Sequence, residues 1–419
     1  MLKTRTTCRI CGSNIVDILD LGEYYLPVYK NDDIPLIDRT IPLVLSRCDS
    51  LNSENACGLV QLRHSTPPYL LYKNYFYRSA VNSSMVEHLK EMYDEALTLA
   101  KPDKNDVIVD IGCNDGTMLQ YYKDLGYKNV IGFDPARTML KYSSNVDATV
   151  IEDYFNSNSY FKNLNKKAKL ITSIAMFYDL ENPHEFVSDI KSVLDDKGIW
   201  VFEQAYLPEV LKQNTFDTIC HEHLEYYCLF VIENLLNKHD LEVIDVSIDN
   251  TNGGSFKVCA AHKGEYDISD DAYTRIQTIR IEEFNKKLDT DAPYKEFAIK
   301  IKENRDKVIN LLKKLKKEGK KVLAYGASTK GSISLQYFGI NEYLISACAD
   351  KNPDKWGLSM IGSNIPIISE EEARKMNPDY FFVLPWHFID GFIEREKDFL
   401  EKGGQFIVPM PELKIIKKN

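Results

Sequence analysis

Val107-Ile108-Val109-Asp110-Ile111-Gly112-Cys113-Asn114-Asp115-Gly116-Thr117 is an apolar run that ends in a glycine-rich turn. A helical pattern follows in residues 118–125, and a second apolar run, residues 129–134, ends in the carboxylate of Asp134. Junctions of strand, turn and helix place ligands at the carboxyl edge of a parallel sheet. The sequence therefore predicts a site in which Asp134 accepts hydrogen bonds from both hydroxyls of a ribose.

The spacing within the turn favours a ligand without a pyrophosphate. Asp110-x-Gly112-x-Asn114-x-Gly116 lacks the Gly-x-x-Gly end of dinucleotide-binding turns. A nicotinamide dinucleotide is the alternative, because its fold also ends the second strand in an acid. Further apolar runs at residues 170–175 and 198–204, separated by a helical segment at 185–194, continue a doubly wound α/β sheet. We expect these residues to bind the cofactor: Asp110, Gly112, Asn114, Asp115, Gly116 and Asp134.

Four of the nine cysteines lie in the first 57 residues. Cys8 and Cys11 form a knuckle followed by glycine, and Cys48 and Cys57 complete a set of four thiolates. Structural Zn²⁺ takes a closed tetrahedral shell of this kind, and a region with so few apolar residues needs a metal as a staple. The alternatives are free thiols, or a shell that His64 completes.

The run Phe216-Asp217-Thr218-Ile219-Cys220-His221-Glu222-His223 packs two imidazoles and two carboxylates into eight residues. Histidine is the side chain most easily set up as a general base near neutral pH, and an adjacent carboxylate can orient it. A metal-ligand pair and a surface accident are the competing interpretations. Because zinc has a better site among the cysteines, the run is predicted to carry proton chemistry.

The carboxyl-terminal third contains a second strand, glycine turn and helix, which begins at Lys321. Residues 327–331 offer backbone amides and the Lys330 cation at a helix start, which suits a diphosphate, although an ordinary surface lysine is equally compatible. Asp350, at the end of the next strand, is placed to bind a ribose. Residues 267–319 are charged, with apolar residues at helical spacing, and predict a connecting helical hairpin with a solvated lysine-rich face.

These motifs, with Glu203-Gln204-Ala205-Tyr206-Leu207 and Asn252-Gly253-Gly254-Ser255-Phe256, resemble the sugar C-methyltransferases over nearly the whole chain. The resemblance implies S-adenosylmethionine as cofactor, a nucleotide-linked keto-deoxysugar as substrate, and methylation at C-3. It implies His223 as the base and Glu222 as the residue that positions it or the sugar. Family members often have Tyr where Cys220 stands and His where Tyr178 stands, and both positions are expected to border the sugar. The remaining predicted contacts are His221, Tyr75 and Tyr77 as donors to an enolate oxygen, and Glu203, Asn252 and Lys330 for substrate binding.

Length and composition set the remaining expectations. With 419 residues, the chain should form several domains. A formal net charge of −10 argues against nucleic acid as a partner, and no segment approaches the roughly 20 apolar residues that span a bilayer. We expect a cytoplasmic protein that is a monomer or a small homo-oligomer. The predicted units are a zinc-binding module (1–75), a methyltransferase domain (76–265), a helical connector (266–320) and a Rossmann-like domain that contributes to nucleotide-sugar binding (321–419).

Carbon becomes a nucleophile here only if a neighbouring ketone makes its C–H bond acidic and a base removes the proton. The predicted chemistry is therefore enolisation by His223, followed by methyl transfer. O-methylation of a sugar hydroxyl is an alternative, because it can use the same base. A zinc-stapled binding module without activity is a further alternative, which the intact Asp110, Gly112, Gly116 and Asp134 set disfavours.

Overall fold

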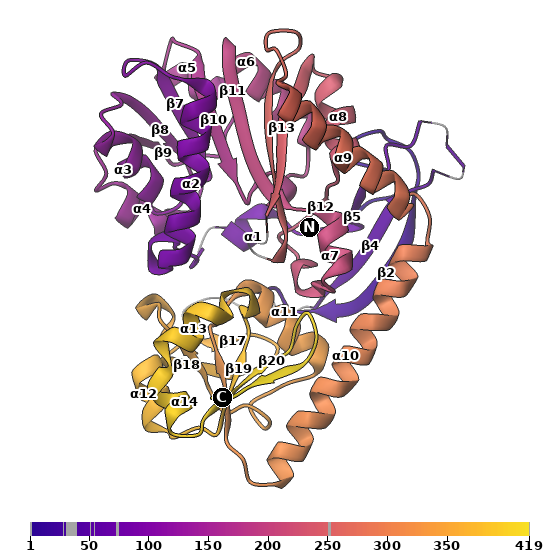
Figure 1. Ribbon diagram of the computed structural model, residues 1–419, viewed down its shortest axis with the longest axis vertical. Coiled ribbons are helices and arrows are strands. Elements are labelled where there is room, and N and C mark those ends of the chain that lie inside the picture. The colour runs from indigo at the N-terminus through magenta and orange to yellow at the C-terminus, as the bar shows by residue number, and fades with distance from the viewer. Residues whose placement is uncertain are drawn as a thin grey trace.

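The computed structural model describes residues 2–27, 29–30, 40–50, 52–53, 55–72, 75–249 and 253–418. Two bodies, each built around its own sheet, face one another, and the N-terminal strands lie beside both (Figure 1). Asn252, a predicted substrate contact, lies outside the described residues.

Seven strands form the sheet of the upper body, in the order β13-β14-β11-β10-β7-β8-β9, and only β14 runs antiparallel to its neighbours. This doubly wound sheet confirms the predicted fold class. The predicted runs at 107–111 and 198–204 fall within strands, and those at 129–134 and 170–175 each extend one residue past the end of a strand. The strands are β7 (Val107–Ile111), β8 (Asn129–Phe133), β9 (Thr149–Ile151), β10 (Ala168–Ile174), β11 (Leu194–Ala205), β13 (Leu241–Asp249) and β14 (Ser255–His262).

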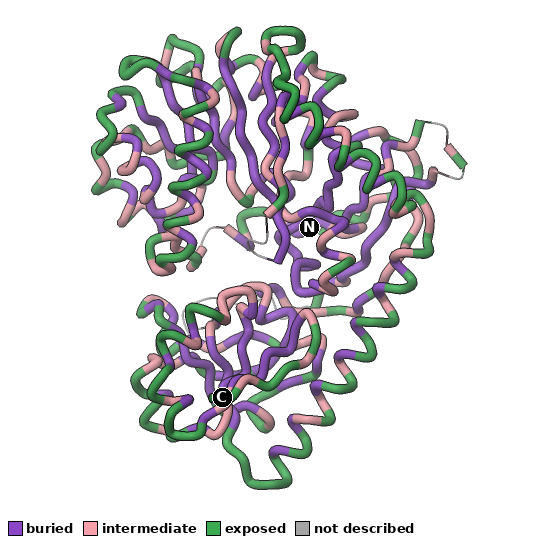
Figure 2. Tube along the Cα trace, viewed as in Figure 1, coloured by how far each residue is buried: buried purple, intermediate pink, exposed green. Residues whose placement is uncertain are grey.

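Helices cover both faces of this sheet, so its central strands are apolar on both sides and appear purple along their length in Figure 2. Val107, Val109 and Ile111 point to one layer of helices, whereas Ile108 points to the other. One face carries α2 (Ser83–Ala100) and α3 (Thr117–Asp124), and the other carries α6 (Pro183–Val193) and α8 (Leu229–Asn237). Shorter helices are α1 (Pro68–Tyr72), α4 (Arg137–Ser143), α5 (Ser157–Asn163) and α7 (Leu207–Lys212), and the 3₁₀ turns here are η1 (Ser79–Val81), η2 (Phe177–Asp179) and η3 (Phe216–Thr218).

The N-terminal sheet shares strands with the other parts of the chain. Its order is β12-β5-β4-β2, and β12 (Glu225–Tyr226) begins two residues after His223. β3 (Tyr29–Lys30) instead joins the edge of the C-terminal sheet, where it pairs with β17 (Ser359–Met360). The N-terminal strands therefore join the His-Glu-His segment to the lower body. The others are β1 (Lys3–Thr4), β2 (Ile15–Tyr24), β4 (Ile41–Cys48), β5 (Val60–Leu62) and β6 (His64–Ser65).

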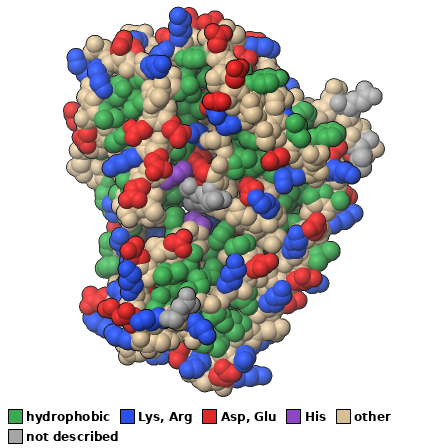
Figure 3. All heavy atoms as spheres, in the orientation of Figure 1, with side chains coloured by type: hydrophobic (Ala, Val, Ile, Leu, Met, Phe, Trp, Pro, Cys, Tyr) green, Lys and Arg blue, Asp and Glu red, His purple; other side chains and the backbone are tan. Residues whose placement is uncertain are grey.

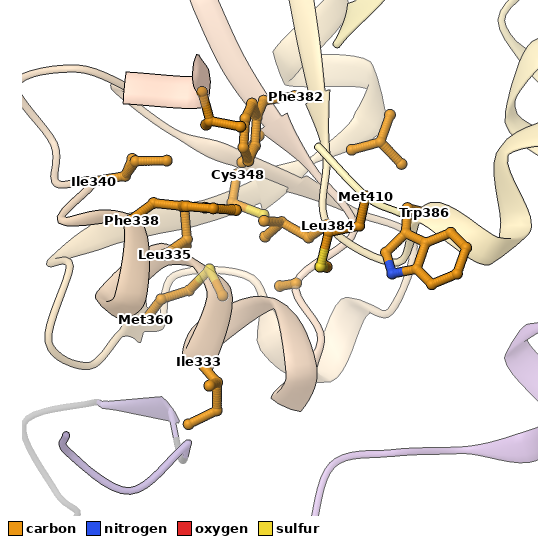
Figure 4. Close-up of a cluster of buried hydrophobic side chains, with 14 of the residues drawn as sticks. Ile333, Leu335, Phe338, Ile340, Cys348, Met360, Phe382, Leu384, Trp386 and Met410 are labelled. Carbon is orange, nitrogen blue, oxygen red and sulfur yellow. The ribbon is translucent and has the colours of Figure 1, made fainter. Parts of the chain in front are cut away.

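The lower body has an eight-stranded sheet in the order β21-β20-β19-β15-β16-β18-β17-β3, with five parallel strands at its centre. Phe338, on a helix over this sheet, meets the sheet residue Phe382 edge to face, at a centroid distance of 6.4 Å (Figure 4). The strands are β15 (Val322–Tyr325), β16 (Cys348–Asp350), β18 (Ile365–Ser369), β19 (Tyr380–Val383), β20 (Gln405–Val408) and β21 (Lys414–Ile416). The helices are α11 (Thr329–Phe338), α12 (Glu370–Lys375), α13 (Ile389–Arg395) and α14 (Lys397–Glu401), with 3₁₀ turns η5 (Pro353–Lys355) and η6 (Trp386–Phe388).

The connector is helical, but it is not a hairpin. α9 (Asp270–Lys286) packs on β13 and α8 of the upper body, whereas α10 (Ala292–Lys317) packs on β2, α7 and α11. The two helices follow one another along the side of the molecule (Figure 1). The hairpin prediction is wrong because the two helices bury their apolar stripes against different parts of the protein. The spacing of apolar residues in the sequence does not show what each stripe packs against.

Charged side chains of both signs are interspersed over the face of the molecule shown in Figure 3. Among the described residues, no helix combines the length and the apolar composition that a membrane span needs.

Candidate active site

A cleft of ≈ 900 Å³ is lined by residues of both bodies and by the segment that follows α1. It brings together most of the predicted site residues, although they are spread over more than 250 positions of the sequence. Gly116 and His221 are not among the residues that line it. The predicted site residues that do line the cleft are Tyr75, Tyr77, Asp110, Gly112, Asn114, Asp115, Asp134, Tyr178, Glu203, Glu222, His223 and Lys330.

The glycine turn is held against the end of β8 by a carboxylate. Asp134 accepts hydrogen bonds from the backbone N–H groups of Asn114 and Ala136, both at 2.8 Å, and burial raises the pKa of Asp134 to about 6. Gly132, opposite Asp110 in the ladder, permits this approach, since a Cβ there would lie 2.6 Å from Cys113 Sγ. Each carboxylate oxygen can accept a second hydrogen bond, so Asp134 can still bind a ribose.

Asp110 and Asp115 bind groups of the chain itself. Asp110 accepts from the Tyr93 hydroxyl at 2.6 Å and the Thr172 hydroxyl at 2.7 Å, beneath the turn. Asp115 accepts from the Thr117 hydroxyl at 2.6 Å and from the backbone N–H of Ala80 at 2.9 Å. These two predicted cofactor ligands therefore hold the walls of the cleft in place, and Asp115 fixes the segment that carries Tyr77.

Gly116 precedes α3 with φ +79°, and a Cβ there would lie 2.9 Å from Val146 Cγ2 and 3.1 Å from Ser143 Cα. We expect Gly116→Ala to destabilise the turn by about 1–2 kcal/mol, because left-handed backbone is strained for residues with a Cβ. Calorimetry should then show weaker binding of the ligand that this turn holds, with ligand affinity at the second glycine turn, residues 326–331, unchanged. Gly126→Ala, at φ +87° with no neighbouring atom within 4 Å, is the matched control for backbone strain alone.

His223 is fixed in one tautomer. Its Nδ1 lies 2.8 Å from the carbonyl oxygen of Thr218, which can only accept, so Nδ1 carries the hydrogen and the lone pair lies on Nε2. The ring packs against Tyr178 at a centroid distance of 4.1 Å. Burial, together with the charge of Lys330, lowers the pKa of His223 to about 3. The imidazole is therefore neutral at physiological pH, which is the state that a base requires.

Glu222, Cys220 and His223 offer potential ligand atoms within 4.8 Å of one another. Burial raises the pKa of the Cys220 thiol well above its usual range and the pKa of Glu222 to about 8. Both groups therefore hold their protons at neutral pH, whereas metals bind the deprotonated forms. This set is better suited to proton transfer than to metal binding.

His221 requires a correction. Its Nε2–H donates to the carbonyl oxygen of Ile41 at 3.1 Å, and its ring lines a second cavity behind the cleft. Residues 220–223 form a tight turn, in which the N–H of His223 donates to the carbonyl oxygen of Cys220 at 3.1 Å, and His221 lines the second cavity whereas His223 lines the cleft. The prediction that His221 donates to an enolate oxygen is therefore wrong.

The second glycine turn repeats the geometry of the first. Asp350 accepts from the backbone N–H groups of Ala327 and Asn352, both at 2.7 Å, as Asp134 does from Asn114 and Ala136. Ser328 is the N-cap residue of α11, and its hydroxyl oxygen accepts a hydrogen bond from the backbone N–H of Gly331 at 3.0 Å. Lys330 follows in the first turn of this helix and lines the same cleft as His223.

Glu203 is engaged by a histidine. His88 Nε2 lies 3.0 and 3.1 Å from its two carboxylate oxygens, and burial raises the pKa of Glu203 to about 7. Glu203 lines the cleft, as predicted for a substrate contact, but its orientation depends on α2.

The four N-terminal cysteines converge. Cys8 and Cys57, Cys11 and Cys48, and Cys48 and Cys57 have Sγ atoms 3.5–3.6 Å apart. A tetrahedron of sulfurs about 2.3 Å from a zinc ion has edges of about 3.8 Å, so the thiols fit that metal closely. His64 does not belong to this group of potential ligands.

Several residues that line the cleft were not predicted from the sequence. Asp153 and Tyr154 follow β9 and could have been found, since they repeat the strand-then-acid pattern of β8. Tyr72, Asp179 and His387 also line it, and no motif marks them. Thr218 acts through its backbone carbonyl, for which a sequence carries no signal.

Two family models match the chain: a methyltransferase domain at residues 85–246 and a C-methyltransferase C-terminal domain at residues 250–411. The chain is 30% identical over 414 residues to the C-methyltransferase NovU of Streptomyces niveus, covering 98% of this chain and 96% of that one. Among solved structures, the magnesium protoporphyrin IX methyltransferase ChlM of Synechocystis PCC 6803 with bound SAH is 14% identical (43% of this chain, 84% of that chain, TM-score 0.34). An S-adenosylmethionine-dependent methyltransferase of Clostridium acetobutylicum is 13% identical (43% and 92%, TM-score 0.34).

Proposed function

The chain belongs to the S-adenosylmethionine-dependent C-methyltransferase family, and from this premise we propose that it methylates the carbon beside the ketone of a nucleotide-linked keto-deoxysugar. The observation that carries the proposal is the placement of His223 Nε2 in one cleft with both glycine turns. A base, a turn suited to a methyl donor and a turn suited to a diphosphate are what such a reaction requires.

In the proposed reaction, His223 Nε2 removes the proton from C-3, one of the two carbons that flank the ketone of a 4-keto sugar. Tyr75 and Tyr77, which line the cleft, are placed to donate hydrogen bonds to the enolate oxygen. S-adenosylmethionine, when bound beside the turn of residues 112–116, supplies an electrophilic methyl group. Tyr178 keeps the imidazole ring in position, because the two rings are in contact.

The substrate's own charge should activate the base. Lys330 helps to keep the pKa of His223 low. A diphosphate bound at the start of α11 would neutralise that cation, so the pKa of His223 would rise only when the nucleotide-sugar is in place. This arrangement couples substrate binding to the strength of the base.

Lys330→Ala is expected to raise KM for the nucleotide-sugar by roughly 10- to 100-fold, because hydrogen bonds to charged groups contribute about 1.5–3 kcal/mol. The kcat should change much less, since the same substitution removes a charge that weakens His223. Steady-state kinetics check this, with Lys375→Ala, at the end of α12 and outside the cleft, as the matched control. An equal fall in kcat at unchanged KM would contradict the assignment of Lys330 to the diphosphate.

We also propose that Cys8, Cys11, Cys48 and Cys57 hold a structural Zn²⁺. The close approach of the four sulfurs supports this assignment, and a shell of four thiolates leaves the metal no position for substrate.

A panel experiment tests the function. The protein is incubated with S-adenosylmethionine and with nucleoside-diphosphate-linked deoxysugars of two classes, keto sugars and the matching sugars that lack the ketone. The masses of the products are measured by mass spectrometry. We expect a gain of one methyl group only in the keto sugars. Methylation of both classes alike would contradict enolisation and favour attack by a hydroxyl.

A further inference from the structure

A second cavity, of ≈ 320 Å³, lies directly behind the His-Glu-His segment. Lys3 and Glu181 stand at its edge, with side chains 56% and 30% exposed, so the cavity reaches solvent there. We call it the rear cavity.

A thin partition separates the rear cavity from the cleft. Six residues line both, which means that each presents atoms to the two spaces: Pro68, Leu71, Tyr72, Asp179, Glu181 and Glu222. Three of them, Pro68, Leu71 and Tyr72, have apolar or aromatic side chains, and the other three have carboxyl side chains. The carboxyl of Glu222 is buried beside His223, and the half-buried carboxyl of Asp179 lies close enough to Glu222 to interact with it.

The polar groups of the partition contact one another. The Tyr72 hydroxyl donates to the carbonyl oxygen of Glu222 at 3.5 Å and lies near the Asp179 carboxyl. One oxygen of that carboxyl, Oδ1, is buried with no hydrogen-bond partner among the described residues. Buried polar atoms rarely lack a partner, so this oxygen is placed to bind a water or to exchange a proton.

The proposed reaction leaves one proton behind in every turnover. The carbon–hydrogen bond breaks and its proton goes to His223, and the enolate carbon forms a bond to the methyl group. The sulfur–methyl bonding pair stays on sulfur, which turns a cationic sulfonium into a neutral thioether. One proton therefore remains on the base, and it must reach solvent before the next turnover.

The cleft is a poor exit for that proton, because sugar and cofactor fill it at the moment when His223 is charged. Resting on the proposed function, we propose that the proton leaves His223 through Glu222 and Asp179 into the rear cavity. A carboxylic acid can take a proton on one oxygen while it releases one from the other, so Glu222 relays without a net change of its own. Asp179 passes the proton to water in the rear cavity, and Glu181 borders the opening.

The electrostatics agree in direction with this route. Burial lowers the pKa of His223, so its imidazolium releases a proton readily. Burial raises the pKa of Glu222 to about 8, so this carboxyl is already protonated at neutral pH and can take a proton on one oxygen only as it releases one from the other. Burial also raises the pKa of Asp179 well above its usual range. Asp179 is thus a relay residue that acts through Glu222.

The test compares the first turnover with later ones in the full-length protein. The substrate is a nucleoside-diphosphate-linked 4-keto-deoxysugar that wild-type protein methylates. The variants are Asp179→Asn, which keeps the shape, Asp179→Glu, which keeps a carboxyl, and Tyr72→Phe, which keeps both buried carboxyls. Rapid quench gives the first-turnover rate. Deuterium uptake at the sugar carbon from heavy water, with S-adenosylhomocysteine bound, reports proton removal and its exchange with solvent in the absence of methyl transfer.

For Asp179→Asn we expect a first-turnover rate within about threefold of wild type, and steady-state turnover and deuterium uptake at least about tenfold lower, since a general acid–base step contributes 10²–10⁴-fold. Asp179→Glu, or added formate, should restore both, and Tyr72→Phe should lower both to a smaller extent. Unchanged steady-state turnover in Asp179→Asn, or a first turnover that falls in parallel with it, overturns the relay. If wild-type protein methylates no keto sugar, the proposed function itself fails, which is a different result.

Discussion

His223→Ala is expected to lower kcat by about 100- to 10,000-fold, the contribution of a positioned general base. KM for the nucleotide-sugar should change little, because the diphosphate is assigned to the start of α11. The same variant should lose deuterium uptake at the sugar carbon, because His223 is the imidazole assigned to remove that proton. Steady-state kinetics and mass spectrometry of the recovered sugar measure the two effects.

His239→Gln serves as the control for the loss of a histidine, because its ring contacts His184 at 2.8 Å and does not line the cleft. It should retain wild-type kcat. A His223→Ala protein that still exchanges the proton at the wild-type rate would show that another group is the base.

Removal of the N-terminal metal is expected to have the largest effect on stability. Cys48 ends β4, which pairs with β5, and β5 pairs with β12 next to His223. Cys57→Ser should therefore lower both zinc content and activity. Structural zinc contributes roughly 10 kcal/mol in small domains, and each kcal/mol shifts Tm by about 2–4 °C in chains of this class, so a fall of more than about 10 °C is expected.

Zinc analysis by atomic emission and thermal unfolding monitored by circular dichroism check this result. Cys259→Ala is the matched control, since Cys259 is a buried cysteine of β14 outside the cluster. It should keep one zinc per chain. Equal zinc content and equal Tm in Cys57→Ser and wild type would exclude the cysteine cluster as a structural metal site.

The sequence predicted the parts of the site that follow one another in the chain. The turn of residues 112–116 and the acid of Asp134 are local consequences of a strand that ends in a glycine turn, and the structure places both at the cleft. The cysteine cluster was also predictable, because four cysteines in a small region with few apolar residues are typical of a structural metal site. His223 was marked by its neighbours in the sequence.

The rest depends on contacts between distant segments. His221 and His223 are two residues apart, yet Ile41 holds one ring and Thr218 the other, and they line different cavities. Trp386 of the lower body contacts Asp217 at 3.3 Å, one residue before the carbonyl that orients the base. The arrangement of α9 and α10 likewise depends on which part of the protein each helix packs against. Periodicity shows that a helix has an apolar stripe, but it does not say what covers that stripe.

The position of the new methyl group tests the central claim most directly. Wild-type protein is incubated in heavy water with S-adenosylmethionine and a nucleoside-diphosphate-linked 4-keto-deoxysugar, and the product is examined by NMR. Enolisation by His223 predicts a carbon–carbon bond to the methyl group at the position next to the ketone, with deuterium entering the unreacted sugar at that same position. A methyl group on oxygen, with every carbon-bound hydrogen of the sugar retained, would contradict the account.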